Sequence, residues 1–243
     1  MSNNVVQSLW VGDRLTAMEQ LCISSFLRCG HEFHLFTYAP VEGIPRGTIV
    51  RDGNEILPQA DIFTYRSGFG QGSVSAFSNF FRYRLLHDRG GWWVDTDVVC
   101  LRPFDFSDEC ILGTERVDPR LDTLIVSSAV IKQPIGSALI EWAWSACQKA
   151  NVETLAWGDV GPRLLQRGVD ALGLHTQLRP HTFFSPVAHY DWASFVDVVP
   201  PAPFGSEVFA VHLFHQMWCH NNVDLDKRFP QSCLYEQLKQ RFL

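Results

Sequence analysis

Two aspartates, Asp95 and Asp97, stand two residues apart inside the apolar run GGWWVDTDVV, which spans residues 90–99. Residues i and i+2 of a strand point to the same face, so a strand here would project both carboxylates together and Thr96 away from them. Two buried carboxylates this close repel each other unless one is protonated or a cation lies between them. Mg²⁺ and Mn²⁺ typically bind through one or two carboxylates and substrate phosphates. The pair therefore predicts a site for Mn²⁺, or alternatively Mg²⁺, and a diphosphate.

A second pair, Asp224 and Asp226, has the same spacing but lies in a polar stretch without a strand pattern. We interpret this second pair as solvated surface. The first pair instead follows an amphipathic helix, a Gly-Gly stop and an aromatic-rich strand. It should therefore lie near the carboxyl end of a strand, where open α/β sheets bind their ligands.

The elements that must position these residues alternate between strand and helix patterns. Strands are predicted over residues 5–11, 32–38, 92–101, 110–114, 123–132 and 208–214, with a short one from residue 48. Helices are predicted from Thr16, with Glu19 at capping-box spacing, to Gly30, and over residues 76–89, 136–150, 162–171 and 234–242. This alternation predicts an α/β fold with a mainly parallel sheet flanked by helices. The glycine-rich stretch 67–75 is expected to be a mobile loop that closes over a bound ligand.

Composition limits the function classes. The chain has 243 residues, 46% hydrophobic and 19% charged, which is typical of a packed globular domain. Its net charge of -6 argues against a general affinity for nucleic acid. The seven cysteines include no CxxC pair, and the start lacks the features of a signal peptide. We therefore expect a cytoplasmic protein.

The span SNFFRYRLLHDRGGWWVDTDVV, residues 78–99, resembles the DXD sugar-binding segment of family 32 glycosyltransferases. This group includes fungal mannosyltransferases and α-1,4-galactosyltransferases, is similar to bacterial enzymes of surface polysaccharide synthesis, and shares the segment with the glucosylating domains of large clostridial toxins. The resemblance implies one GT-A-like, Rossmann-type domain over residues 1–243. Residues 1–103 would bind nucleotide sugar and metal, and residues 104–243 would form the acceptor side, with a C-terminal segment closing on metal and nucleotide.

The resemblance also implies roles for residues around the donor. Trp10, beside Val11 and Gly12, matches a first-strand motif whose ring stacks on the nucleotide base, although plain core packing is the alternative. Arg82 matches a helix arginine that reaches the donor sugar and phosphates, a task that suits a planar guanidinium. Asn79 stands where relatives usually carry Asp, and its amide can bond sugar hydroxyls without bringing charge.

Three later segments are similar to the family as well. His212 matches the residue that completes the metal site with Asp97 and Asp95, and Trp218 matches a ring that closes over the nucleotide. Ser128 lies where relatives have an element beneath the donor. Asp159 is a candidate contact to donor or acceptor, with helix capping as the alternative.

Two other interpretations of His212 remain open. A zinc cluster could combine it with His215, Cys219 and His220, but the spacing matches no zinc module known to us. It could also be an ordinary core histidine.

The implied function is metal-dependent, retaining transfer of a hexose from a nucleotide sugar to a hydroxyl of a glycan or lipid-linked glycan. UDP is favoured over GDP as the donor nucleotide. The catalytic set would be Asp95, Asp97, Arg82 and Asp159. A lipid-linked acceptor would bring the protein to the inner face of the membrane as a peripheral protein, although we favour an ordinary amphipathic closing helix for residues 234–243.

Competing functions are a non-catalytic or hydrolytic nucleotide-sugar-binding protein, a dinucleotide-dependent enzyme and a glycoside hydrolase. The glycines at 68, 70 and 72 have neither the spacing nor the place of a dinucleotide fingerprint. Two acids that converge on one point do not readily flank a glycosidic bond, because the carboxyl groups of a hydrolase stand roughly 5 Å or more apart.

Overall fold

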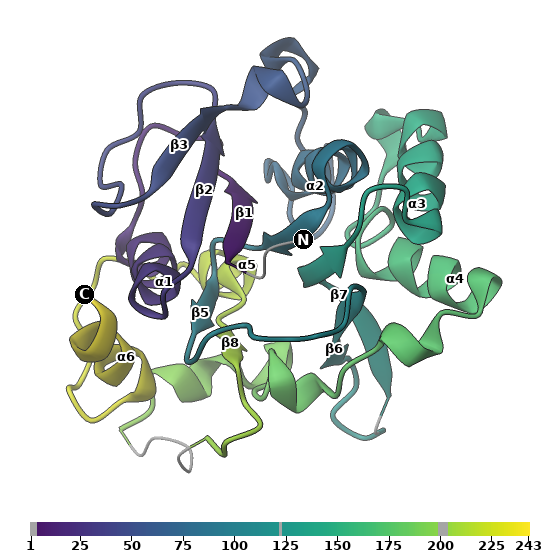
Figure 1. The fold of residues 1–243 in the computed structure, drawn as a ribbon. Coiled ribbons are helices and arrows are strands. Elements are labelled where there is room, and N and C mark those ends of the chain that lie inside the picture. Colours follow the sequence, from purple (N-terminus) through teal and green to yellow (C-terminus); the bar gives the residue numbers. More distant parts are fainter. Residues whose placement is uncertain (1–3, 122, 199–203) are drawn as a thin grey trace.

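The computed structural model describes residues 4–121, 123–198 and 204–243 (Figure 1). A six-stranded sheet with the order β3-β2-β1-β4-β7-β6 forms its centre. These strands are β1 (Val5–Leu9), β2 (Glu32–Thr37), β3 (Ile49–Asp52), β4 (Gly91–Val94), β6 (Ile111–Arg116) and β7 (Leu124–Gln133). Neighbours from β3 to β4 are parallel, whereas β7 is antiparallel to both β4 and β6. The predicted single α/β domain with a mainly parallel sheet is confirmed.

Helices cover both faces of this sheet (Figure 1). They are α1 (Ala17–Arg28), α2 (Ser75–Arg89), α3 (Ala138–Lys149), α4 (Pro162–Leu172), α5 (His215–His220) and α6 (Leu234–Phe242). Short 3₁₀ helices are η1 (Gly53–Glu55), η2 (Gln59–Asp61), η3 (Val152–Thr154), η4 (His175–Gln177), η5 (His181–Phe183) and η6 (His189–Phe195). The core of α2, α3 and α4 lies against one face of the sheet, and that of α1 lies against the other.

Helix α1 begins at the predicted capping box. The Thr16 hydroxyl accepts a hydrogen bond from the Met18 N–H at 3.3 Å, and the Glu19 carboxylate accepts one from the Thr16 N–H at 2.7 Å. These bonds satisfy first-turn N–H groups that have no partner within the helix. The prediction of the helix start from residue types alone is therefore confirmed.

Helix α2 ends at the predicted Gly-Gly stop. Gly90 has φ 62° and Gly91 has φ 91°, a backbone region that other residues rarely adopt. The Gly90 N–H donates to the Leu86 carbonyl at 2.9 Å, which closes the last turn. Strand β4 follows at once, so the two glycines set the angle between the helix and the strand that leads to Asp95.

The predicted strand over residues 92–101 is wrong in one respect, because it is two strands in two sheets. Strand β4 ends at Val94, and β5 (Val98–Cys100) pairs antiparallel with β8 (Ala210–His212) in a second, two-stranded sheet. Asp95-Thr96-Asp97 forms the turn between them, in which the Val98 N–H donates to the Asp95 carbonyl at 3.2 Å. The two acids thus converge through a turn between sheets and not through strand alternation.

Other boundaries follow the predictions closely. The terminal helix α6 matches its predicted range, and its apolar residues Leu238 and Phe242 are buried against the protein, as expected of an ordinary closing helix. Helix α5 was not expected. It begins after Phe214, whose left-handed φ of 56° turns the chain sharply out of β8.

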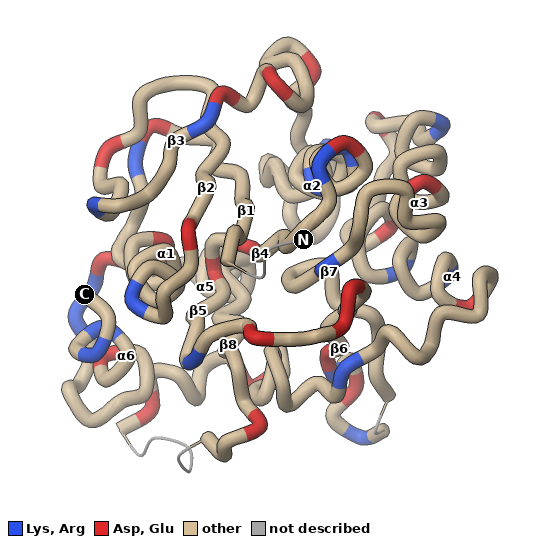
Figure 2. Tube along the Cα trace, in the orientation of Figure 1, with Lys and Arg blue, Asp and Glu red and all other residues tan. Residues whose placement is uncertain are grey.

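Charged residues are spread over many elements in Figure 2, where blue and red segments both occur in most parts of the chain. None of the helices within the described ranges is both long enough and apolar enough to span a bilayer.

Candidate active site

A cleft of about 1020 Å³ opens at the carboxyl ends of β1 and β4. This is the end of the sheet at which open α/β folds bind ligands. Its lining includes most of the predicted site residues: Trp10, Val11, Asn79, Arg82, Asp95, Asp97, Ser128 and His212. Residues that lie far apart in the sequence therefore face one shared cavity.

Three of these residues form a candidate metal site. Asp95, Asp97 and His212 each offer one ligand atom, and these atoms lie within 4.8 Å of one another. The pairing of Val98 with His212 in the second sheet brings the histidine to the aspartates. Two carboxylates and one imidazole fit a divalent cation such as Mn²⁺, because carboxylates suit hard cations and imidazole suits transition metals.

Asp95 is held by two residues of the core. Its Oδ1 lies 2.9 Å from Arg82 Nη1 and accepts a hydrogen bond from the Trp93 indole at 2.7 Å. The Arg82 side chain is only 3% exposed, lies over the Trp93 ring and also donates to the Ser128 carbonyl. Burial raises the pKa of Asp95, and the Arg82 charge opposes this rise. In this structure the charged group that Arg82 contacts is therefore the Asp95 carboxylate.

Asp97 is held by the C-terminal part of the chain. Its Oδ2 accepts a hydrogen bond from the His215 N–H at 2.8 Å and lies 3.3 Å from His212 Nε2. Burial opposes ionisation of Asp97, but the neighbouring His212 and His215 lower its pKa well below the ordinary value. Burial likewise disfavours a charged His212, yet Asp97 and then Glu115 raise its pKa to about 10. Without a metal, His212 is thus the cation that compensates Asp97 at neutral pH.

The left-handed Phe214 makes the contact between His215 and Asp97. It reverses the chain between β8 and α5, so that the first N–H of α5 reaches the carboxylate. Its ring also lies 4.0 Å from the ring of His212. A non-glycine residue in this conformation is strained, and such strain is concentrated at functional sites.

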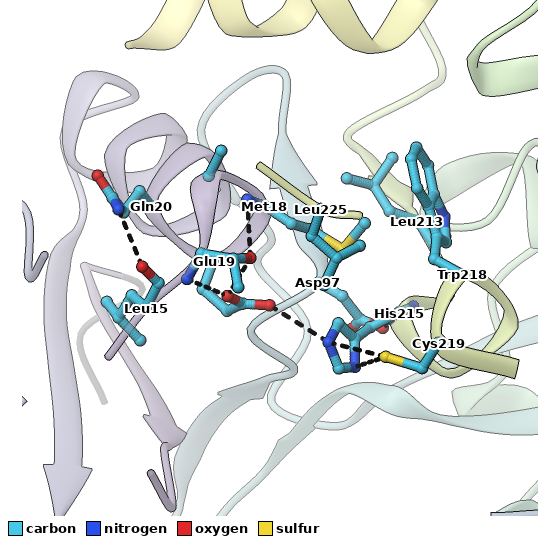
Figure 3. Close-up of polar contacts among 12 residues, drawn as sticks. Leu15, Met18, Glu19, Gln20, Asp97, Leu213, His215, Trp218, Cys219 and Leu225 are labelled. Atoms are coloured by element: carbon cyan, nitrogen blue, oxygen red, sulfur yellow. Dashed lines mark hydrogen bonds and ion pairs between the residues drawn. The ribbon is translucent and has the colours of Figure 1, made fainter. Parts of the chain in front are cut away.

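Figure 3 shows the carboxylate of Glu19 beside His215 at the start of α5. The sequence predicted only a helix-capping role for Glu19. Glu19 Oε1 lies 3.7 Å from His215 Nε2, and the Glu19 side chain is 1% exposed. The Cys219 sulfur lies 3.5 Å from the same nitrogen. Glu19 thus serves both α1 and the segment that binds Asp97, a second task that no local pattern indicates.

Sequence reasoning also missed Glu115 and the role of Ser127. Glu115 lines the cleft, and its Oε2 lies 3.7 Å from His212 Nδ1. Ser127 donates to that oxygen at 3.2 Å. A single acid in β6, between Thr114 and Arg116, gives no local sign of this contact, since the partner is on another sheet.

Trp10 and its neighbour Gly12 differ in their exposure to the cleft. Trp10 is half-buried and lines the cleft. Its indole N–H is buried without a hydrogen-bond partner in the described part of the chain. Gly12 is exposed, and a Cβ there would stand 3.0 Å from that indole nitrogen. Gly12 therefore supports Trp10 by allowing close approach.

Trp218 lies in the core. It is 0% exposed, its indole donates to the Leu213 carbonyl at 2.8 Å, and its ring packs against Tyr235 and Trp192. A fully packed and hydrogen-bonded indole has no free face for a nucleotide. This placement does not support the expected closing role.

Asp159 lies in a local turn before α4. Its carboxylate accepts hydrogen bonds from the Ala156 N–H at 2.8 Å and from Arg163 at 2.9 Å. These bonds agree with a local structural role, close to the capping alternative. The expected contact to donor or acceptor stays a prediction.

The glycine-rich loop forms one wall of the cleft. Gly68, Gly70 and Gly72 all have positive φ, and a Cβ at Gly70 would overlap the Trp157 ring. Phe69 lies between Gly68 and Gly70, and its ring centroid is 4.8 Å from that of His220 on α5. The loop and α5 therefore meet across the cleft. The expected loop motion stays a prediction.

The zinc alternative finds no support. Within residues 4–121, 123–198 and 204–243, Asp95, Asp97 and His212 make up the sole group of three or more His, Cys, Asp or Glu with ligand atoms close enough for a metal. His215 contacts Cys219 and lies near Glu19, but these residues do not form such a group in the described ranges, and His220 faces Phe69.

Comparison with known proteins bears on this site. Residues 71–118 match the family described as glycosyltransferase sugar-binding region containing DXD motif. No curated protein sequence matches the chain. Among solved structures, the PaToxG glycosyltransferase is 14% identical, with 72% of this chain and 73% of that chain covered and a TM-score of 0.47. A transferase with two cysteine-to-serine substitutions is 11% identical, with 71% of this chain and 86% of that chain covered and a TM-score of 0.42. Residues 71–118, which contain Asp95 and Asp97, are therefore similar to the DXD sugar-binding region of glycosyltransferases.

Proposed function

We propose that this protein is a metal-dependent glycosyltransferase that moves a hexose from a nucleoside diphosphate sugar to a hydroxyl of a glycan acceptor. One observation carries the proposal: Asp95, Asp97 and His212 converge in one cleft, and both aspartates lie in the segment that is similar to the glycosyltransferase DXD region. UDP is the favoured nucleotide, from the likeness of the Trp10 strand to UDP-sugar users. Retention of configuration follows from the family resemblance alone.

Asp97 and His212 would hold the metal, with Asp95 reaching it directly or through water. When bound, Mn²⁺ or Mg²⁺ supplies positive charge that stabilises the leaving diphosphate as the glycosidic bond breaks. Asp95 can bind the metal while it is paired with Arg82, because a carboxylate has two oxygens and Arg82 and Trp93 both approach Oδ1. Arg82 offsets one carboxylate charge, so that a dication leaves net attraction for a diphosphate.

The donor would lie between Trp10 and α2. Trp10 offers a ring at the end of β1 for stacking on the base. Asn79 is 5% exposed; its Nδ2 donates to the Ser75 carbonyl, whereas Oδ1 has no hydrogen-bond partner among the described residues. That free acceptor suits a sugar hydroxyl, and a buried acceptor gains most from being paired. Ser128 lines the same cavity beside Arg82.

The acceptor is a glycan, including one on a lipid carrier. A lipid-linked acceptor would place the reaction at the cytoplasmic face of a membrane, with the protein bound there peripherally. Because the apolar face of α6 is packed against the protein, such contact would have to use another surface.

The direct test is a transfer and hydrolysis assay with a panel of UDP- and GDP-hexoses, after EDTA treatment and after return of Mn²⁺. We expect turnover only with the metal. Thermal shifts with the same donors name the nucleotide, since a ligand that binds the native state raises its apparent stability. Turnover that is unaffected by EDTA would refute the proposal, and binding without turnover would favour a non-catalytic sugar-nucleotide protein.

A further inference from the structure

His212 has two ring nitrogens, and only one of them faces the aspartates. Nε2 lies 3.3 Å from Asp97 Oδ2, whereas Nδ1 points toward Glu115 Oε2 at 3.7 Å. Within the described part of the chain, Nδ1 is buried with no hydrogen-bond partner. The Glu115 side chain is 14% exposed and that of His212 is 11% exposed, so little water competes for this contact.

Strands β6 and β7 fix the Glu115 carboxylate. The Ser127 hydroxyl donates to Glu115 Oε2 at 3.2 Å and accepts from the Ala129 N–H at 3.2 Å. The pairing of these strands is irregular between Leu112 and Thr114, directly before Glu115. Such irregularities re-aim side chains next to active sites.

The same short segment of β7 also contacts Asp95 and its partner Arg82. The Ala129 carbonyl accepts from the Asp95 N–H at 2.9 Å, and the Ser128 carbonyl accepts from Arg82. Residues 127–129 thus connect Glu115 to the DXD turn. A carboxylate built into this support has a defined position relative to the imidazole.

We propose that Glu115 is a positioning residue that selects the tautomer and ring orientation of His212, an inference that rests on the proposed metal site. A carboxylate beside Nδ1 favours a proton on that nitrogen. The lone pair of Nε2 then points toward Asp97 and the cation, which is how carboxylates orient metal-binding histidines. Glu115 is not a ligand, since it faces the far nitrogen of the ring.

The test compares Glu115→Ala and Glu115→Gln with the matched control Glu109→Ala, an exposed acid just before β6. Titration calorimetry measures Mn²⁺ binding to the metal-free protein without donor. We expect Glu115→Ala to bind about 10–100-fold more weakly, the usual effect of removing such a partner. Glu115→Gln should lose less, because its amide oxygen still accepts a hydrogen bond, and Glu109→Ala should bind as the wild type does.

A spectroscopic measurement separates positioning from general destabilisation. With Cd²⁺ as a diamagnetic probe, the ring ¹⁵N spectrum of the wild type should show His212 protonated at Nδ1 and bound through Nε2. In Glu115→Ala we expect a mixture of rings bound through Nε2 and rings bound through Nδ1. Ser127→Ala, which removes only the hydroxyl that holds Glu115, should shift Mn²⁺ affinity in the same direction by a smaller factor.

The outcomes distinguish this inference from the proposed function. If the wild type binds Mn²⁺ and both Glu115 variants bind equally well with an unchanged ring spectrum, the positioning role is refuted and the metal site stands. If the wild type itself binds no Mn²⁺, the proposed function fails first. Should Glu115→Ala not fold, the isosteric Glu115→Gln and Ser127→Ala decide by the same two measurements.

Discussion

The chain contains two Asp-x-Asp sequences, one with its acids in the cleft and one with its acids on the surface. In Asp95-Thr96-Asp97 the acids point into the cleft toward Arg82 and His212. In Asp224-Leu225-Asp226 both acids are exposed, and the middle residue is buried in the core. The expectation that the second pair is surface is confirmed.

The second pair nonetheless has a structural task. Asp226 accepts hydrogen bonds from the Ala17 N–H at 2.8 Å and from Arg14 at 2.7 Å, which ties the C-terminal segment to the start of α1. Asp226 is satisfied by a helix start and by an exposed arginine, whereas the acids of the first pair lie beside the buried side chains of Arg82 and His212. The difference teaches that the partners of a DXD sequence, and not its spacing, decide whether it can bind metal.

The two motifs should differ most in how much stability is lost when the arginine that contacts each of them is replaced. The Arg82 side chain is 3% exposed, and Arg82→Met leaves the Asp95 carboxylate without its cation. Because breaking a buried ion pair is strongly destabilising, we expect the free energy of unfolding to fall by about 3–5 kcal/mol. Arg14 is 57% exposed, so Arg14→Met should cost about 0–1 kcal/mol. Denaturant unfolding of the metal-free variants measures both values. Equal costs would mean that burial does not separate the two motifs.

Activity should separate the second aspartates of the two motifs. We expect Asp97→Asn to lower the transfer rate by about 10²–10³-fold, the usual effect of losing one group that stabilises transition-state charge. Asp226→Asn should transfer at the wild-type rate, because it lies outside the cleft at the start of α1. Steady-state assays at saturating Mn²⁺ decide this, with circular dichroism to confirm that both variants fold. Comparable losses in the two variants would contradict the comparison.

For the residues between the aspartates, Leu225 and Thr96, we expect the larger loss of stability in the second motif. Leu225 is 8% exposed within the C-terminal core, so Leu225→Ala should cost about 2–3 kcal/mol. Thr96 is partly exposed at the cleft, and Thr96→Ala should change stability by less than about 0.5 kcal/mol. Thermal unfolding of the two variants checks this. A larger loss at Thr96 would show that its side chain supports the turn.

Only the first motif should link metal binding to pH. The raised pKa of His212, about 10, means that the metal-free protein carries a proton on this ring at neutral pH, and a metal must displace it. Mn²⁺ affinity should therefore rise up to about tenfold per pH unit between roughly pH 7 and 9. Calorimetry in buffers of different ionisation enthalpy should detect about one released proton. A pH-independent affinity would mean that His212 does not bind the metal.

The same shift has a consequence for stability without metal. A histidine whose pKa is raised on folding stabilises the protein fully below its unfolded value, and this contribution is lost as pH rises through the folded value. The ion pair of His212 should thus contribute at neutral pH and disappear toward pH 10. The variant His212→Gln should remove that part of the pH dependence.

The sequence by itself determined the elements and the edge of the sheet where the acids lie. The capping box of Thr16 and Glu19, the Gly90-Gly91 stop and the periodicity of α2 are local patterns, so each specifies its structure without distant contacts. The family resemblance added His212, whose approach to Asp97 no spacing of residues implies.

Tertiary structure alone decided which side chains meet. The break between β4 and β5 depends on pairing with β8, far along the chain, and hydrophobic periodicity cannot tell one long strand from two strands in different sheets. The burial of Trp218, the commitment of Arg82 to Asp95 and the approach of Glu115 to His212 are likewise long-range contacts. Residue types say what a side chain can do, and only the fold determines which partner it contacts.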